Sequence, residues 1–160
     1  MKEKPKNIKR YTAASLGYLG LVPPFIGLGA SLASYISHLE NFEFNLLYAN
    51  MILSFLGGTH WYAGITSETK APIRKILVGI ISSLAGVTSL LIGGVIGAFV
   101  TTAGLLVLGV IEKYQPLSED VGIEWYLSLR INLTAGLISL LLVSLWLSTQ
   151  QNLLDFFIER

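Results

Sequence analysis

His60 is the residue whose chemistry stands out most, because it lies in the otherwise largely apolar and glycine-rich stretch ILSFLGGTHWYAGI, residues 52–65. Such a stretch is typical of a segment that lies inside lipid. Ionisable side chains are costly to bury at membrane depth, and those that occur there commonly bind, relay or pair with another polar group. His60 is therefore a candidate functional residue. The alternative interpretation is that it only holds neighbouring helices together.

Further polar and aromatic residues are expected at the same membrane face as His60. Arg130 lies one turn into an apolar segment, so we expect its guanidinium to reach the interface or to pair with Glu112 or Glu124. The predicted inner-face polar cluster consists of His60, Trp61, Glu112, Trp125, Tyr126, Arg130 and Thr134. The alternative is a set of interfacial aromatic residues with a hydrogen-bond network that joins the helices.

The sequence lacks the residues and motifs of most familiar active sites. It contains no cysteine, which excludes disulfides, thiolate nucleophiles, iron–sulfur clusters and cysteine zinc sites. Its two histidines, His38 and His60, are expected at opposite membrane faces, which disfavours haem ligation by both. Phosphate-binding loops, dinucleotide fingerprints and nucleophile elbows are absent from the sequence. We therefore expect no enzymatic activity, no metal and no cofactor, although bound lipid is expected.

The composition predicts a membrane protein of the all-α class. Hydrophobic residues make up 52% of the 160 residues and charged residues only 13%, and the mean hydropathy is +0.63. A water-soluble domain of this size would lack the polar surface that it needs. We predict a single integral membrane domain, a bundle of transmembrane helices, whose partners are the lipid bilayer and either other membrane proteins or further copies of itself. The basic head is explained by topology, so no nucleic-acid partner is expected.

Five spans fit the apolar pattern best. Residues 76–111 are almost uninterruptedly apolar, and one straight helix of that length would measure roughly 54 Å, against about 30 Å for the hydrocarbon core. We expect the chain to turn back at Gly93 and Gly94; one long tilted helix, giving four spans, is the alternative. The predicted segments are a basic head at 1–10, spans at about 11–37, 46–66, 74–92, 95–112 and 125–148, and an amphipathic tail at 149–160.

Prolines and glycines mark the expected break and packing positions. Pro23 and Pro24 remove backbone donors and crowd the carbonyls of Leu19 and Gly20, so the first helix should break there. The freed carbonyls need partners, which makes the break either a packing joint or part of a ligand site. Small residues let helix backbones approach closely within lipid. The positions expected to serve the break and helix packing are Gly20, Pro23, Pro24, Gly57, Gly58, Gly93, Gly94 and Gly97.

The distribution of basic residues predicts the orientation. With five spans and the N-terminus inside, the inner side holds five Lys or Arg in the head, three in residues 67–75, Lys113 and Arg130, and the outer side holds only Arg160. Four spans would leave nine inside and two outside. This bias follows the positive-inside rule. The Lys-rich head lacks the pattern of a mitochondrial presequence, which favours a bacterial inner membrane, with the mitochondrial inner membrane as the alternative.

Three segments carry a resemblance to a known family. LGYLGLVPPF at 16–25, ILSFLGGTHW at 52–61 and EWYLSLRINLT at 124–134 resemble, in order and spacing, signatures of the transmembrane-protein-69-like family of unknown function. Its members are small multi-pass proteins of bacterial inner membranes and mitochondria. Tyr62 departs from the pattern, where the family usually has glycine. The matching positions are Gly20, Pro24, Phe25, Ser54, Phe55, Gly57, Gly58, His60, Trp61, Trp125, Tyr126, Leu129, Arg130, Leu133 and Thr134.

The resemblance implies a location and an architecture, but the family has no established reaction that it could imply for this chain. Two function classes are therefore expected. The first is a non-catalytic accessory or structural subunit that packs into an inner-membrane assembly, with a respiratory complex as one option. The second is a small oligomeric transporter or channel that uses the polar cluster around His60, Glu112 and Arg130. The absence of an internal sequence repeat counts against the second class.

Overall fold

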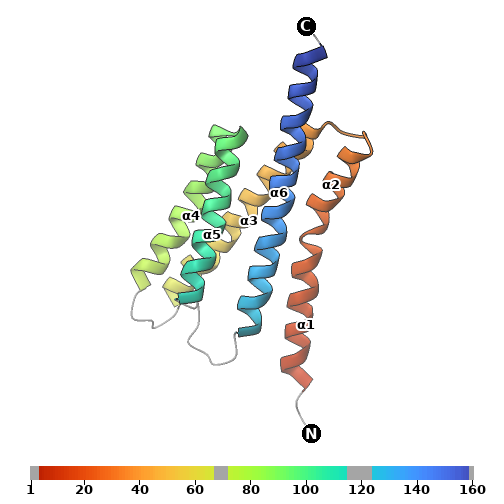
Figure 1. Ribbon diagram of the computed structural model, residues 1–160. Coiled ribbons are helices and arrows are strands. Elements are labelled where there is room, and N and C mark those ends of the chain that lie inside the picture. Colours follow the sequence, from red (N-terminus) through yellow and green to blue (C-terminus); the bar gives the residue numbers. More distant parts are fainter. Residues whose placement is uncertain (1–3, 67–71, 115–123, 159–160) are drawn as a thin grey trace.

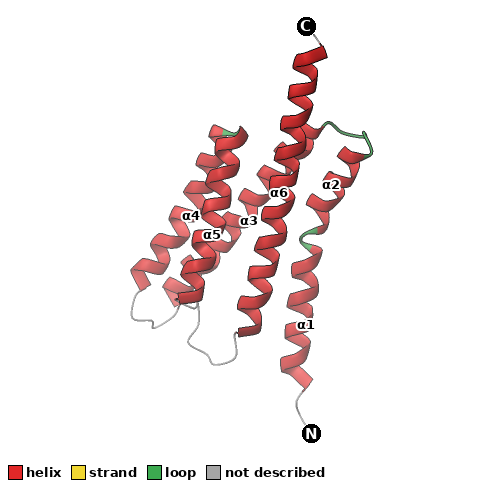
Figure 2. Cartoon of the chain, viewed as in Figure 1, coloured by secondary structure: helices red, strands yellow, loops and turns green. Residues whose placement is uncertain are grey.

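The computed structural model describes residues 4–66, 72–114 and 124–158, and within these ranges every regular element is an α-helix (Figure 2). This confirms the predicted all-α bundle. The helices are α1 (Lys4–Leu19), α2 (Val22–Leu32), α3 (His38–Thr66), α4 (Pro72–Ile92), α5 (Gly94–Tyr114) and α6 (Glu124–Ile158). Helix α1 thus begins inside the predicted head, and α6 continues through most of the predicted tail.

The helices run alternately up and down, in five passes (Figure 1). Helices α1 and α2 together make the first pass, and α3, α4, α5 and α6 make the others. Helix α3 packs against α2, α4, α5 and α6, whereas the main contact of α1 is with α6. Helix α3 is therefore the central element of the bundle.

Four segments are long and apolar enough to cross a membrane, and α3 is not among them. These segments are Arg10–Leu32, Pro72–Ile92, Gly94–Tyr114 and Trp125–Leu153. Helix α3 is less apolar because it carries Asn41, Asn45, Asn50 and His60, each at most 2% exposed. The neighbouring helices shield these polar groups, and α3 connects opposite ends of the bundle (Figure 1). The arrangement is compatible with the predicted five spans.

The first pass breaks between α1 and α2, at Gly20 and Leu21. The sequence places the break at Pro23 and Pro24, but these prolines lie inside the first turn of α2. The break falls one turn earlier because a proline ring crowds the carbonyl four residues before it. The Tyr48 hydroxyl donates a hydrogen bond of 2.5 Å to the Gly20 carbonyl. A freed carbonyl thus has its partner on α3, as a buried backbone acceptor requires.

The turn between α4 and α5 is formed by the glycine pair that the sequence predicted. Gly93 and Gly94 have φ angles of +64° and +56°, in the left-handed region that only glycine adopts without strain. The backbone N–H of Gly97 donates to the Gly93 carbonyl at 2.8 Å, which starts α5 at once. The alternative of one long tilted helix is wrong.

Helices α3 and α4 approach each other closely at a pair of glycines. A Cβ atom added to Gly57 would lie 2.8 Å from the Gly79 carbonyl oxygen and 2.9 Å from the Ser82 Cβ. A Cβ added to Gly79 would lie 2.6 Å from the Gly57 carbonyl oxygen. The neighbouring Gly58 has no atom within 4 Å of such a Cβ. The two adjacent glycines therefore have different roles, since only Gly57 is needed for the helix contact.

One polar network lies at the end of the bundle where α3 begins. The side-chain amides of Asn41 and Asn45 both donate to the Ser144 hydroxyl on α6, at 2.9 Å and 2.6 Å. The hydroxyl of Ser144 in turn donates to the Leu140 carbonyl within α6 at 2.8 Å. This network links α3 to α6.

A second polar network lies near the middle of α3 and is followed by an apolar layer. The Asn50 amide donates to the Ser89 hydroxyl at 3.1 Å, and the Thr101 hydroxyl donates to the Asn50 amide oxygen at 3.0 Å. This network links α3, α4 and α5. Below it, toward the C-terminal end of α3, the interior is filled by Leu53, Leu105 and Leu108, none more than 2% exposed.

The N-terminus of α3 is closed by a capping box formed by Ser37 and Glu40. The Ser37 hydroxyl accepts the Glu40 backbone N–H at 3.0 Å, and a Glu40 carboxylate oxygen accepts the Ser37 backbone N–H at 2.8 Å. Ser37→Ala should destabilise the fold by about 1 kcal/mol because it removes the acceptor for an unpaired helix N–H. Reversible unfolding of the purified protein in mixed micelles measures this loss, and the exposed Ser15→Ala is the control. An unchanged unfolding midpoint for Ser37→Ala would contradict the cap.

The same cap gives a pH dependence. Glu40 lies at the exposed start of α3, outside the apolar spans, and the hydrogen bond from the Ser37 backbone N–H lowers the pKa of its carboxyl below the ordinary value of 4.5. Since the folded-state pKa is the lower one, the cap stabilises the protein above pH 4.5. This contribution is lost as the pH falls through the folded-state value. Glu40→Gln should remove that part of the acid sensitivity.

Candidate functional site

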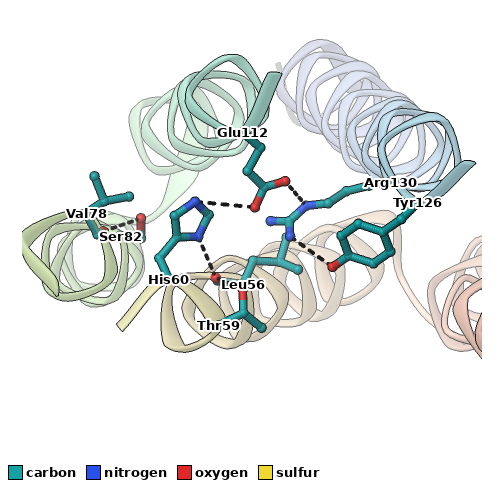
Figure 3. A network of polar contacts seen from close by, with 8 residues as sticks. All are labelled: Leu56, Thr59, His60, Val78, Ser82, Glu112, Tyr126 and Arg130. Atoms are coloured by element: carbon teal, nitrogen blue, oxygen red, sulfur yellow. Dashed lines mark hydrogen bonds and ion pairs between the residues drawn. The ribbon is translucent and has the colours of Figure 1, made fainter. Parts of the chain in front are cut away.

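Three helices bring ionisable side chains together inside one end of the bundle (Figure 3). His60 comes from α3, Glu112 from α5 and Arg130 from α6. The Arg130 Nε lies 2.6 Å from Glu112 Oε2, and the His60 Nε2 lies 3.5 Å from Glu112 Oε1. The three residues are only 1%, 4% and 6% exposed. We call this set the charged cluster.

The three side chains of the charged cluster meet because each lies near a helix end at the same end of the bundle. His60 lies near the C-terminal end of α3, Glu112 near the C-terminal end of α5, and Arg130 near the N-terminal end of α6. Because α5 and α6 are antiparallel neighbours, their joined ends place Glu112 beside Arg130 (Figure 1). The apolar layer lies between this cluster and the Asn50 network along all of these helices. The charged cluster is thus separated from the Asn50 network.

The protonation of His60 can be read from its hydrogen bond. Its Nδ1 lies 3.2 Å from the Leu56 carbonyl oxygen, which can only accept, so Nδ1 carries a proton. The other nitrogen, Nε2, faces a carboxylate oxygen of Glu112. Two acceptors repel each other, so this contact is attractive only when one of the two atoms holds a further proton. At 3.5 Å the contact between Nε2 and Oε1 lacks hydrogen-bond geometry, so both atoms keep capacity for a proton or a further partner.

The hydrogen-bonding capacity of the charged cluster is not used up by protein groups. Arg130 Nη1 donates to the Tyr126 hydroxyl over a long 3.4 Å. Four buried atoms of the cluster lack a partner with hydrogen-bond geometry among the described residues: His60 Nε2, both Glu112 carboxylate oxygens and Arg130 Nη2. This holds for Glu112 although its Oε2 lies only 2.6 Å from Arg130 Nε. Buried polar atoms are usually satisfied by protein or by water. The unpaired atoms make this cluster the strongest candidate site in the described part of the chain.

Two cavities lie on either side of Arg130. The larger, of about 420 Å³, lies between α1, α3 and α6, and its wall is apolar except for a few residues such as Tyr48, Tyr126, Arg130 and Thr134. The smaller, of about 230 Å³, lies between α5 and α6 and is lined by Glu112, Lys113, Arg130 and Thr134 among apolar residues. Arg130 and Thr134 line both cavities.

The remaining residues of the predicted cluster lie at its edge. Trp61 is half-exposed, and its backbone packs against Gly79 of α4. Trp125 makes an edge contact with Tyr126 at 6.0 Å between ring centroids, and the guanidinium of Arg10 lies 5.7 Å above the Trp125 ring. This cation–π contact joins α1 to α6. The side chain of Glu124, the other predicted partner of Arg130, lies outside the described residues.

Sequence reasoning did not single out the buried asparagines. Asn41 and Asn45 are four residues apart and thus lie on one face of α3, and this spacing was the available signal. His38, at the first residue of α3, and His60 are separated by roughly 33 Å along that helix at 1.5 Å per residue. Within the described ranges, no three His, Cys, Asp or Glu side chains gather closely enough to hold a metal ion.

Taken together, these features define an all-helical membrane protein with a charged cluster inside its bundle. The chain belongs to the family described as a protein of unknown function, DUF3429, whose profile matches residues 10–146. This range runs from α1 into α6 and contains the whole charged cluster and all three segments of the resemblance described above. No curated protein and no solved structure matches the chain.

Proposed function

We propose that this protein is a non-catalytic accessory or structural subunit that packs into an assembly of the inner membrane. The observation that carries the proposal is the set of glycines on the bundle surface that contact nothing. A Cβ added to Gly29, Gly58 or Gly109 would meet no atom within 4 Å. In lipid, such positions let the backbone of another helix approach closely. A second chain could therefore pack there without displacing any helix of the bundle.

The closed interior supports the same proposal. Leu53 on α3 and Leu105 and Leu108 on α5 fill the space between the Asn50 network and the charged cluster. A path for ions or polar solutes would have to cross this apolar layer. The interior thus favours a packing role over conduction.

The choice of membrane is part of the proposal. The basic residues in the head and in residues 67–75 support an N-terminus on the inner side, by the positive-inside rule. The resemblance to the transmembrane-protein-69-like family supports an inner membrane, bacterial or mitochondrial. The family match itself carries no activity, compartment or partner.

Extraction in a mild detergent, followed by sizing and mass spectrometry, tests the subunit proposal. We expect the protein to elute in a complex, and Gly58→Leu to release a folded monomer because the larger side chain blocks a neighbouring helix. Met51→Leu is the matched control, since Met51 is 62% exposed on the same helix and its size barely changes. Recovery of the wild-type protein only as a free monomer would contradict the proposal.

The charged cluster favours a second candidate, a small oligomeric transporter. His60 and Glu112 face each other at 3.5 Å next to an unpaired donor of Arg130, and a proton that passes between them would couple proton movement to a conformational change. Flux assays in liposomes decide this. His60→Gln should keep the fold and abolish a proton-dependent flux if the protein transports, and wild-type liposomes without any flux would remove the candidate.

A further inference from the structure

The larger cavity has the shape and composition of a site for an apolar chain. Its volume of about 420 Å³ falls within the range of small-molecule sites in proteins. Leu16 of α1 and Phe55 of α3 line it and are more than 60% exposed, so the cavity opens on the lipid-facing surface between these helices. Further inside, Ile52, Leu133 and Leu137 continue the apolar wall. A hydrocarbon chain can therefore enter from the membrane.

One polar group in the wall is buried and incompletely paired. Arg130 lines the cavity beside Tyr126, and the hydrogen bond between them is long, at 3.4 Å. The Arg130 Nη2 has no hydrogen-bond partner among the described residues, although the side chain is only 7% exposed. A guanidinium carries five N–H donors and no acceptor. The group that completes this site must therefore accept hydrogen bonds.

The charge balance decides which kind of acceptor fits. The negative charge of Glu112, 2.6 Å from Arg130 Nε, already balances the guanidinium. An anionic head group would bring a second negative charge into a site that is shielded from water, at a high desolvation cost. A neutral carbonyl oxygen accepts a hydrogen bond without that cost. We infer that the cavity binds a long-chain membrane lipid through a neutral carbonyl group held by Arg130 and Tyr126.

Two kinds of membrane lipid share this chemistry, a quinone with an alkyl or isoprenoid tail and a glycerolipid with acyl esters. Purified full-length protein in dodecylmaltoside micelles is titrated with three radiolabelled probes, namely decylubiquinone, dioleoylglycerol and oleate. We expect saturable binding at one site of decylubiquinone or of dioleoylglycerol, and the probe that binds identifies the kind of lipid. Oleate, the anionic probe, should bind at least tenfold more weakly. Tighter binding of oleate, or no saturable binding of any probe, would overturn the inference.

Two variants test the location of the site. Ala13 of α1 is exposed and lines the cavity, so Ala13→Phe should fill it and weaken binding at least tenfold. Ser15→Phe places the same ring on an exposed position of the same helix that does not line the cavity, and binding should not change. Equal affinity of Ala13→Phe and Ser15→Phe would place the ligand elsewhere and refute the assignment.

The polar contact has its own variant. Arg130→Lys keeps the positive charge opposite Glu112 but removes the planar set of donors, and it should weaken binding about tenfold, as expected for one hydrogen bond to a charged group. Unchanged affinity would show that the carbonyl is not held by Arg130. If Arg130→Lys does not fold, the comparison of Ala13→Phe with Ser15→Phe still decides the inference.

Discussion

Replacing Arg130 by methionine should destabilise the bundle by about 3–5 kcal/mol. Methionine fills much of the same volume, so the loss comes mainly from Glu112, whose carboxylate is 4% exposed and would lose its cationic partner at 2.6 Å. Removing one partner of a buried ion pair costs more than the pair contributes, because the remaining charge stays desolvated. Reversible unfolding in mixed micelles, followed by circular dichroism, measures the free energy of unfolding.

The double variant Glu112→Met with Arg130→Met separates this explanation from a simple packing defect. Without either charge nothing is left unpaired, so we expect most of the lost stability to return. Lys113→Met is the control, since Lys113 is an exposed neighbour of Glu112 on α5 and should matter little. A double variant as unstable as Arg130→Met would mean that the ion pair does not account for the loss.

The adjacent glycines of α3 should respond to the same substitution in opposite ways. Gly57→Ala places a methyl group 2.8 Å from the Gly79 carbonyl, so α3 and α4 must move apart, and we expect a loss of about 1–3 kcal/mol. Gly58→Ala meets no neighbour, and alanine favours a helix over glycine by up to about 1 kcal/mol, so this variant should be as stable as the wild type or more stable.

The same micelle unfolding assay compares these two variants directly. Both carry the same substitution on the same helix, one residue apart, so expression and detergent effects should be closely matched. Equal stability of the two variants would contradict the close contact between α3 and α4. A loss in Gly58→Ala alone would instead indicate that this face is covered in the purified protein.

The architecture could be predicted largely because its signals are local. Gly93 and Gly94 interrupt an apolar run too long for one span, and only glycine takes their positive φ angles without strain. Pro23 and Pro24 predicted a break through a short-range clash with the Leu19 and Gly20 carbonyls, and the helix is interrupted at Gly20 and Leu21, where that clash acts. Such features depend on residues that are neighbours in the chain.

The partners within the site depend on how distant helices meet, and the sequence leaves them open. Because a buried charge is costly, the sequence predicts that Arg130 has a partner, but it does not decide between Glu112 and Glu124. The packing of α5 beside α6 shows that the partner is Glu112. The asparagines of α3 were missed for the same reason. An asparagine on a transmembrane helix can face lipid, water or another helix, and only the surrounding helices show that Asn45 and Asn50 face inward.

The polar character of α3 has a consequence for how the chain enters the bilayer. Three asparagines and two histidines make this helix less apolar than the other passes, and it is also the helix that those passes surround. Stable insertion of α3 therefore depends on partners that are synthesised after it, first α4 and later α6. The central helix of the finished bundle thus reaches its final surroundings only after α6 has been synthesised.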